Sequence, residues 1–388
     1  MASSDNHVPF APTGKEDWLT QVNKELKGKS VETLDWELNE RIRMEPLYTA
    51  DEVPARQPLN RQPGWSIGAY VDGKSNADIN TYALEELSGG AEALLFRLFR
   101  QPGPDDIAAI LKDVRVDMIS LHCALRYPGQ DPAELFRDLV RYLRKQGYDL
   151  SKITGSVDFD PLLDWSDPPF PPLIRLMYFV QRWMPGFRVL QVNAAGFNNG
   201  AGMADDELAL AIAKGTEYLA QLQERGYPPG LAHRHLKFAF TVGTSFYTDV
   251  AKLRALRVLW ANVLRDFGVD NPAPTQIAAH SDIGTLTNER DENLLRLTTQ
   301  ALAAVTGGAD TIFLAPAEGP DKTPTPFGRR MARNVQHLLR LESGLGQLPD
   351  PAAGSFYLEK LTDALVESAW GRFKSIEEQG GFAQATVF

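Results

Sequence analysis

The feature that most constrains this chain is a regular alternation between short apolar runs and longer segments of helical periodicity. The alternation begins at Trp65 and continues to about residue 340. The short runs have the length and the β-branched or aromatic composition of strands, whereas apolar residues in the longer segments recur every three or four positions. The clear strand-like runs are 91–99, 116–123, 152–159, 187–193, 235–242, 276–281 and 310–314, and a further one is indicated at 66–70.

Helix-like segments follow these runs in turn, at 76–87, 104–114, 132–146, 173–183, 204–225, 245–267 and 291–305, with another that starts near Phe327. Strands that each lead into a helix predict an α/β fold, and eight of them predict a parallel (β/α)8 TIM barrel in preference to an open sheet. No Gly-x-Gly-x-x-Gly follows an early strand, which disfavours a dinucleotide-binding sheet. In such a barrel, the carboxyl ends of the strands form the functional face.

The barrel is predicted to be one of three parts. A chain of 388 residues has room for a barrel of about 250 residues with additions. We assign 1–62 to an N-terminal helical and extended arm with a linker, 63–350 to the barrel, and 351–388 to C-terminal helices. The arm carries an amphipathic unit, Lys15–Leu26, which continues through Val31–Leu38 and has no strand partner in view. Two alternatives stay open: the arm packs back on the barrel, or it covers a second subunit.

Charge and cysteine content restrict the possible partners. The formal net charge of -10 at pH 7 argues against nucleic acid or an anionic membrane as the main partner. Cys123 is the only cysteine, so a disulfide within the chain and a multi-cysteine zinc site are excluded. Its place in an apolar run indicates a buried thiol. The sequence shows neither a secretory signal nor an apolar run near 20 residues long, so we predict a cytoplasmic protein.

Several longer stretches resemble one enzyme family. Phe246–Ala261 reads FYTDVAKLRALRVLWA, 293–308 reads NLLRLTTQALAAVTGG, and 329–362 contains RRMARNVQ, ES and DPAAGSFYLEKLT. Together with His280-Ser281 and the segment from Pro63 to Tyr70, they resemble the methylmalonyl-CoA mutase family. The resemblance implies a (β/α)8 barrel that holds the pantetheine of an acyl-CoA along its axis. It also implies isomerisation of methylmalonyl-CoA to succinyl-CoA, started by adenosylcobalamin.

The residues that such a site requires are largely missing. Where catalytic members of the family carry a Tyr-His pair, this chain has Ala195 and Gly196, whose side chains donate no hydrogen bond. The family's substrate-binding arginine falls near Asp167, and a carboxylate there repels a substrate carboxylate. Asp282 stands where the family has a glutamine. We therefore predict no catalytic residue in this chain and a vestigial pocket made of Tyr70, Asn193, His280, Ser281 and Asp282.

The family's cobalamin-binding motif, Asp-x-His-x-x-Gly, is not matched in this chain. Only His7 has an aspartate two residues before it, and Phe10 stands where the motif needs glycine. The chain ends at Phe388, shortly after the helix that leads to the cobalamin domain in the family. We expect that this chain binds no cofactor and that a partner subunit carries adenosylcobalamin.

Taken together, these features resemble the small, non-catalytic subunit of heterodimeric methylmalonyl-CoA mutases, here as a barrel without the cobalamin-binding domain. The expected partner is the catalytic large subunit, with self-association as an alternative, and a CoA ester is a candidate ligand. The chain is expected to be a subunit of an isomerase and inactive alone. Two other hypotheses stay open: the substrate-binding barrel of a split acyl-CoA mutase whose cobalamin domain is on another chain, and a divergent acyl-CoA binding module.

Other polar groups receive structural interpretations. Asp158 and Asp160 belong to an aspartate series whose spacing suits a metal, but the neighbouring prolines favour a rigid loop, and no metal site is predicted. His233 and His235 are interpreted as an exposed loop or cap. The arginines that follow Phe327 are interpreted as a solvated helix face and not as a site for CoA phosphates; they are Arg329, Arg330, Arg333 and Arg340.

Overall fold

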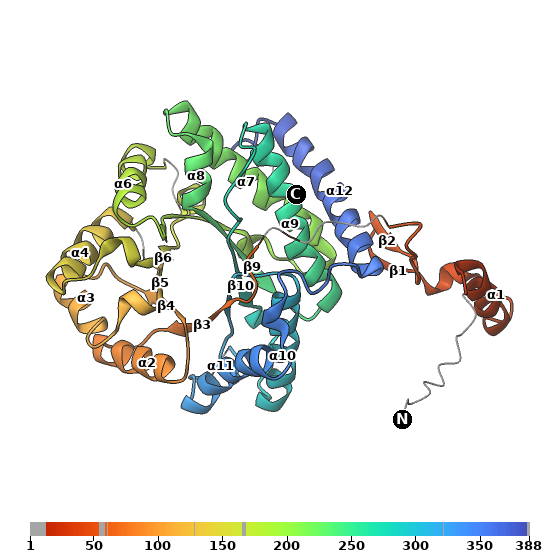
Figure 1. Ribbon diagram of the computed structural model, residues 1–388, viewed down its shortest axis with the longest axis horizontal. Helices are drawn as coiled ribbons and strands as arrows, with labels where there is room; N and C mark the ends of the chain where they lie inside the picture. Colours follow the sequence, from red (N-terminus) through yellow and green to blue (C-terminus); the bar gives the residue numbers. More distant parts are fainter. Residues whose placement is uncertain are drawn as a thin grey trace, which may run out of the picture.

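The computed structural model describes residues 13–53, 59, 61–127, 129–164, 168–320 and 322–385, which form a parallel α/β barrel with an arm at its side (Figure 1). The strands of the barrel are β3 (Ser66–Val71), β4 (Ala93–Leu98), β5 (Ser120–Leu125), β6 (Thr154–Val157), β7 (Phe187–Arg188), β8 (Leu190–Asn193), β9 (Leu236–Val242), β10 (Ile277–Ser281) and β11 (Thr311–Phe313). Their order is β7-β6-β5-β4-β3-β11-β10-β9-β8, and the pairings in this sheet are parallel. The predicted barrel fold is confirmed.

The strand predicted at 187–193 closes the barrel, but it is divided in two. β7 pairs with β6 and β8 pairs with β9, so the halves of one predicted strand join the two edges of the sheet. Val189, between the halves, and Leu190 both belong to the apolar core that lies between the strands and the helices. Residues of a strand normally alternate between faces. Two consecutive residues on the same face shift the alternation by one, and this shift divides the strand.

The predicted helices cover the outside of the barrel in the expected order, and the short helices α5 and α8 were not predicted. The helices are α2 (Asn76–Ser88), α3 (Pro104–Ile110), α4 (Pro132–Lys145), α5 (Pro161–Asp164), α6 (Phe170–Trp183), α7 (Ala204–Glu224), α8 (Pro229–His235), α9 (Phe246–Asp266), α10 (Arg290–Thr306), α11 (Pro326–Leu341) and α12 (Phe356–Glu378). Local signals explain several starts: the Ser75 hydroxyl caps α2, and proline is the first residue of α3, α4 and α11. Within the described ranges, none of the helices combines the length and the apolar character needed to cross a membrane.

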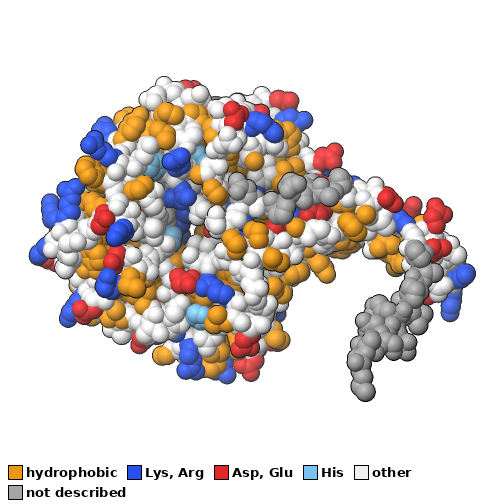
Figure 2. Space-filling view, in the orientation of Figure 1, with side chains coloured by type: hydrophobic (Ala, Val, Ile, Leu, Met, Phe, Trp, Pro, Cys, Tyr) orange, Lys and Arg blue, Asp and Glu red, His pale blue; other side chains and the backbone are white. Residues whose placement is uncertain are grey.

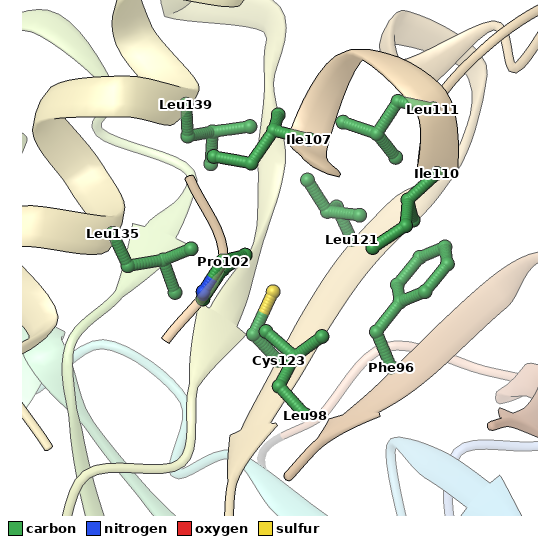
Figure 3. A pocket seen from close by; sticks show the side chains of 10 residues that line it. All are labelled: Phe96, Leu98, Pro102, Ile107, Ile110, Leu111, Leu121, Cys123, Leu135 and Leu139. Atoms are coloured by element: carbon green, nitrogen blue, oxygen red, sulfur yellow. The ribbon is translucent and has the colours of Figure 1, made fainter. Parts of the chain in front are cut away.

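Strand residues that face the helices form the main core. Leu121 and Cys123 of β5 belong to it, and Figure 3 shows them beside Ile107 of α3 and Leu139 of α4 around a small cavity. The cavity measures only about 30 Å³, and its lining side chains are apolar. Burial raises the pKa of the Cys123 thiol to about 12, which keeps it protonated and unreactive. Cys123 is therefore a packing group, as predicted.

The arm differs in part from its prediction. α1 (Lys15–Glu25) forms as expected, but the segment after it contains two short strands, β1 (Trp36–Asn39) and β2 (Ile42–Met44), paired as an antiparallel hairpin. The expectation that the arm lacks a strand partner is wrong, because the arm supplies its own. At the hairpin turn, Arg41 Nε lies 2.7 Å from Asp205 of α7. The hairpin thus packs back on the barrel, whereas α1 buries none of its residues and projects to the side (Figure 1).

The segment from α11 to α12 fastens the C-terminal helix to the barrel. α12 lies along α7 and α9 (Figure 1). Arg254 of α9 pairs with Asp350, in the loop between α11 and α12, and with Glu359 of α12. All three side chains are buried. Their pairing therefore replaces the interactions with water that each charged group loses on burial.

Candidate functional site

An aromatic cluster, which we define as Tyr70, His280 and Phe313, lies inside the barrel near the carboxyl ends of the neighbouring strands β3, β10 and β11. The Tyr70 hydroxyl of β3 and His280 Nδ1 of β10 are 2.8 Å apart. Phe313 of β11 stacks on the His280 ring, with centroids 5.2 Å apart and planes inclined by 13°, and it is fully buried. Burial lowers the pKa of His280 to about 4, so the ring is neutral at pH 7. Phe313 also stands edge-on to His122 of β5, with ring centroids 5.7 Å apart, so aromatic side chains meet across the barrel at this level.

A charged network lies beside the aromatic cluster. Lys237 Nζ of β9 is 2.6 Å from Asp158 Oδ1 and donates to Ser156 Oγ of β6 at 2.7 Å. His122 Nδ1 of β5 lies 2.8 Å from the same hydroxyl oxygen. These four side chains are each 8% exposed or less. Burial alone would raise the pKa of Asp158, but the charge and hydrogen bond of Lys237 outweigh it, and the pKa is lowered. The pair is therefore charged.

The other predicted pocket residues lie at the carboxyl mouth and shape its loops. The Ser281 hydroxyl turns to the end of the neighbouring strand and accepts a backbone N–H at 2.7 Å. Asp282 accepts a backbone N–H at 2.9 Å and the Asn198 amide at 3.3 Å. The backbone N–H of Asn193 donates to Asp160 at 2.8 Å. Of the predicted pocket residues, Tyr70 and His280 therefore contact each other. Ser281, Asp282 and Asn193 make separate contacts.

The turn after β8 carries Ala195 and Gly196, the residues predicted to stand in place of the family's Tyr-His pair. Ala194–Phe197 form a 3-10 turn in which Ala195 is half-buried and Gly196 is exposed. The nearest atom that a Cβ at Gly196 would meet is Asn193 Nδ2, at 3.9 Å. A Cβ at Gly196 would therefore meet no close atom, so the backbone at this position leaves room for a Cβ. Asp167 and the amino-terminal His7 lie outside the described residues.

The aspartates after β6 form ion pairs. Asp158 is held by Lys237, and Asp160 accepts Lys214 Nζ of α7 at 2.6 Å and the Tyr218 hydroxyl. Both carboxylates are buried. In the part of the chain that the structure describes, no group of three or more His, Cys, Asp and Glu side chains is arranged to hold a metal ion.

The prediction of an exposed histidine pair is wrong. His233 and His235 end α8 and are 2% and 3% exposed. His233 Nε2 lies 2.7 Å from the Ala273 carbonyl, and its Nδ1 accepts the Trp260 indole N–H at 3.1 Å. Both ring nitrogens of His233 are thus satisfied by the fold, and the residue is structural. The helical period places it on the buried face of α8, where a polar ring requires such partners.

The prediction of a solvated arginine face on α11 is wrong for Arg329, Arg333 and Arg340, which pair with glutamates, and holds for the exposed Arg330. Arg333 pairs with Glu86 of α2, and both side chains are buried. Arg340 Nη1 lies 2.7 Å from Glu92, and its guanidinium is over the Trp65 ring at 4.9 Å from the centroid. These arginines join α11 to the first βα unit of the barrel, and their charges are already neutralised.

Sequence reasoning missed the interior network because it considered the ends of strands and not their inward faces. Lys237 is the second residue of LKFAFTV, and His122 is the third residue of SLHCAL. A charged side chain at an inward position of a buried strand requires a partner. That requirement is the signal that could have pointed to Asp158. Phe313 gives no comparable signal, because an aromatic residue is ordinary in a buried strand.

The fold and the site together define a class of protein. It is a parallel (β/α)8 barrel whose interior holds an aromatic cluster and a buried ion pair. The family model of methylmalonyl-CoA mutase matches residues 103–387. The chain belongs to the methylmalonyl-CoA mutase family.

Similarity to individual members extends along nearly the whole chain. The chain is 32% identical to the methylmalonyl-CoA mutase small subunit of Porphyromonas gingivalis, over 97% of this chain and 65% of that protein. It is 33% identical to a probable small subunit of Mycobacterium tuberculosis, over 92% of this chain and 62% of that one. It is 28% identical to a large subunit of Streptomyces virginiae, over 96% and 58%. The chain therefore spans less than two thirds of the length of these relatives.

Proposed function

We propose that this chain is a non-catalytic, small-subunit-type barrel of the methylmalonyl-CoA mutase family and that it supports a catalytic large subunit. The observation that carries the proposal is the filled barrel axis. Phe313 stacks on His280, and Lys237 pairs with Asp158 beside them. A pantetheine chain along the axis would have to displace this stack and separate the pair, and breaking a buried ion pair costs about 3–5 kcal/mol.

The carboxyl mouth supports the same proposal. A thioester oxygen that gains negative charge needs donors already in place, and loss of one such donor costs about 100- to 1000-fold in rate. Ala195 and Gly196 provide none from their side chains. His280 is neutral, and its Nδ1 already faces the Tyr70 hydroxyl. We therefore assign no catalytic step to this chain.

Adenosylcobalamin enters the proposal as a group on the partner subunit. A histidine that acts as a lower ligand needs an accessible ring nitrogen, and the described histidines do not fit this role. His122 and His280 lie inside the barrel, where His122 Nδ1 is 2.8 Å from Ser156 Oγ and His280 Nδ1 is 2.8 Å from the Tyr70 hydroxyl. His233 and His235 are buried at the end of α8. His337 Nε2 lies 3.1 Å from a backbone carbonyl at the amino-terminal side of β4.

The proposed partner is a large subunit of the same family, in a cytoplasmic heterodimer. The projecting helix α1 supports an intersubunit role for the first part of the arm, because its apolar residues are only half-buried within this chain. Those residues are Trp18, Leu19, Val22 and Leu26. The division into arm and linker (1–62), barrel (63–350) and C-terminal helices (351–388) is part of the same proposal.

Coexpression with a large subunit of the family tests the proposal. Affinity capture of this chain should recover the large subunit, and the complex should convert methylmalonyl-CoA to succinyl-CoA in the presence of adenosylcobalamin. Val22→Asp, on the apolar face of α1, should weaken the complex at least tenfold. Asn23→Asp introduces the same charge at the adjacent exposed position and should leave the complex intact. Turnover by this chain alone would contradict the proposal, and so would a large subunit that is fully active without it.

A further inference from the structure

The loop between β8 and α7, residues 194–203, borders the carboxyl mouth and is contacted by both parts of the chain that lie outside the barrel. It contains two short 3-10 turns, Ala194–Phe197 and Ala201–Met203, and neither turn has a side-chain hydrogen bond at its N-cap. Gly196 and Gly200 are exposed. A segment with exposed backbone and few buried apolar side chains opens locally more easily than a strand or a helix. The order of this loop therefore depends on what holds its ends.

A buried lysine of α7 lies beneath the start of the loop. Lysine and arginine side chains are common along the rim of the barrel, where water solvates them (Figure 2). Lys214 differs from these because it is 0% exposed, and its Nζ lies 2.6 Å from Asp160 Oδ2. Asp160 also accepts the backbone N–H of Asn193, the last residue of β8, at 2.8 Å. The ion pair is therefore joined to the beginning of the loop.

Two phenylalanine rings lie beside this lysine, one from the loop and one from the turn after α12, residues 379–385, which we call the C-terminal turn. Lys214 Nζ is 5.3 Å from the ring centroid of Phe197 and 5.6 Å from that of Phe382, and the two centroids are 5.9 Å apart. A cation within about 6 Å of an aromatic centroid is attracted to the ring, and more strongly where water is excluded. The C-terminal turn therefore holds the first end of the loop.

Two glycines bring Phe382 back to α7. Gly380 and Gly381 follow the end of α12 with φ of +102° and +86°, a conformation that residues other than glycine rarely adopt. Gly381 is buried, and a Cβ at this position would meet Glu217 Oε2 of α7 at 3.2 Å. The glycine pair reverses the chain close against α7, and this reversal places the next residue, Phe382, beside Lys214.

The arm holds the other end of the same loop. The Asn39 amide, in the hairpin, donates to the Gly202 carbonyl at 2.8 Å and to Asp205 Oδ1 at 3.0 Å. Arg41 Nε donates to Asp205 Oδ2 at 2.7 Å. Asp205 is 0% exposed, and hydrogen bonds to a buried carboxylate are stronger than those between neutral groups. The hairpin is therefore firmly attached where the loop enters α7.

We propose that the loop 194–203 is a coupling element, which the C-terminal turn and the arm hold from opposite ends, so that release of either end loosens the edge of the carboxyl mouth. The middle of the loop reaches the mouth, where the Asn198 amide donates to Asp282 at 3.3 Å. A partner that moves the hairpin therefore changes the order of the mouth from a distance, and so does a change at the C-terminal turn. This inference does not depend on the supporting role proposed above, because its contacts lie within this chain.

Hydrogen exchange of the full chain, followed by mass spectrometry, tests the coupling. Phe382→Ala should accelerate exchange of the amides of 194–203 about tenfold, because exchange reports local opening. Asn39→Asp keeps the oxygen that accepts the hairpin's own N–H groups and loses the donor to Gly202. It should accelerate the whole loop by a similar factor, including residues 194–197, the end that Phe382 holds. Phe382→Leu, which removes the ring and keeps an apolar side chain, serves if Phe382→Ala does not fold.

Matched controls separate this coupling from a general loss of stability. Phe356→Ala truncates an exposed phenylalanine at the other end of α12, and Asn23→Asp makes the same exchange of side chains on the exposed face of α1. Both should change exchange of the loop by less than about twofold. Strand β4 is the internal reference and should not accelerate in any variant. The proposal is overturned if either test variant leaves the loop unchanged or affects only its own end. It is also overturned if β4 accelerates as much as the loop.

Discussion

Replacement of Lys237 by methionine should destabilise the barrel strongly, because it leaves Asp158 buried without its counter-ion. The two groups are 2.6 Å apart, and their side chains are 5% and 3% exposed. Removal of one partner of a buried pair costs about 3–5 kcal/mol, and loss of the donor to Ser156 adds about 1 kcal/mol. Methionine keeps most of the lysine stem, so the cavity contribution is small. We expect the free energy of unfolding in urea to fall by about 4–6 kcal/mol in total.

The pH dependence of this loss tests its cause. In the wild type, the pKa of Asp158 is lowered, so the pair stabilises the fold above the ordinary carboxyl pKa of about 4 and loses this effect as the pH falls through the lowered value. Without Lys237, burial raises the pKa of Asp158, so the deficit of the variant should shrink between pH 7 and pH 5. Addition of Asp158→Asn should recover most of the loss at pH 7.

Lys360→Met is the matched control, because Lys360 is exposed on α12 and its replacement should change the free energy of unfolding by less than about 0.5 kcal/mol. A loss below about 1 kcal/mol in Lys237→Met would refute a charged, water-excluded interior. So would a deficit that stays constant between pH 7 and pH 5.

Three further predictions concern stability. Phe313→Ala should lower the free energy of unfolding by about 3–5 kcal/mol, since Phe313 is fully buried; a smaller loss in chemical denaturation would argue against a filled axis. Arg333→Gln should cost about 3 kcal/mol by leaving Glu86 buried and unpaired, whereas the exposed Arg330→Gln should cost less than about 0.5 kcal/mol; equal losses would contradict the role given to α11. Burial lowers the pKa of His235 to about 4. The contribution of the neutral His235 ring to the free energy of unfolding is therefore complete above about pH 6.5, and it falls towards pH 4 as the unfolded state takes up the proton. His235→Phe should reduce this fall by about 3 kcal/mol, measured as the free energy of unfolding against pH, and an unchanged slope would refute the neutral state of His235.

The barrel could be predicted because its information is local. Each strand and helix of the barrel carries its own periodicity, and even the weakest run, at 66–70, forms β3. The division of the strand at Val189 could not be predicted, because FRVLQVN reads as one continuous run. The division can be recognised only when the pairing of one half with β6 and of the other half with β9 is known. The hairpin of the arm was missed because β2 has only three residues, too few for a period to show.

Contacts across the barrel were harder to predict than the elements themselves. Tyr70 and His280 both lie near strand ends, so their inclusion in one pocket was foreseeable, and they meet. The pair between Lys237 and Asp158 depends on the register and tilt of nonadjacent strands, which no local pattern contains. The basic face of α11 was visible in the sequence, but its partner, Glu86, lies on a helix about 250 residues away in the chain. Sequence therefore identified charged groups and could not identify their partners.

The central claim, that this barrel supports catalysis without performing it, is tested most directly by turnover of the assembled complex. A large subunit of the family would be combined with this chain carrying Tyr70→Phe and His280→Gln, and isomerisation of methylmalonyl-CoA would be compared with that of the unaltered complex. If the barrel is non-catalytic, the two rates should agree within about twofold, while omission of this chain should impair the large subunit. A loss of about 100-fold or more, the usual effect of removing an acid–base group, would contradict the claim and place chemistry in this barrel.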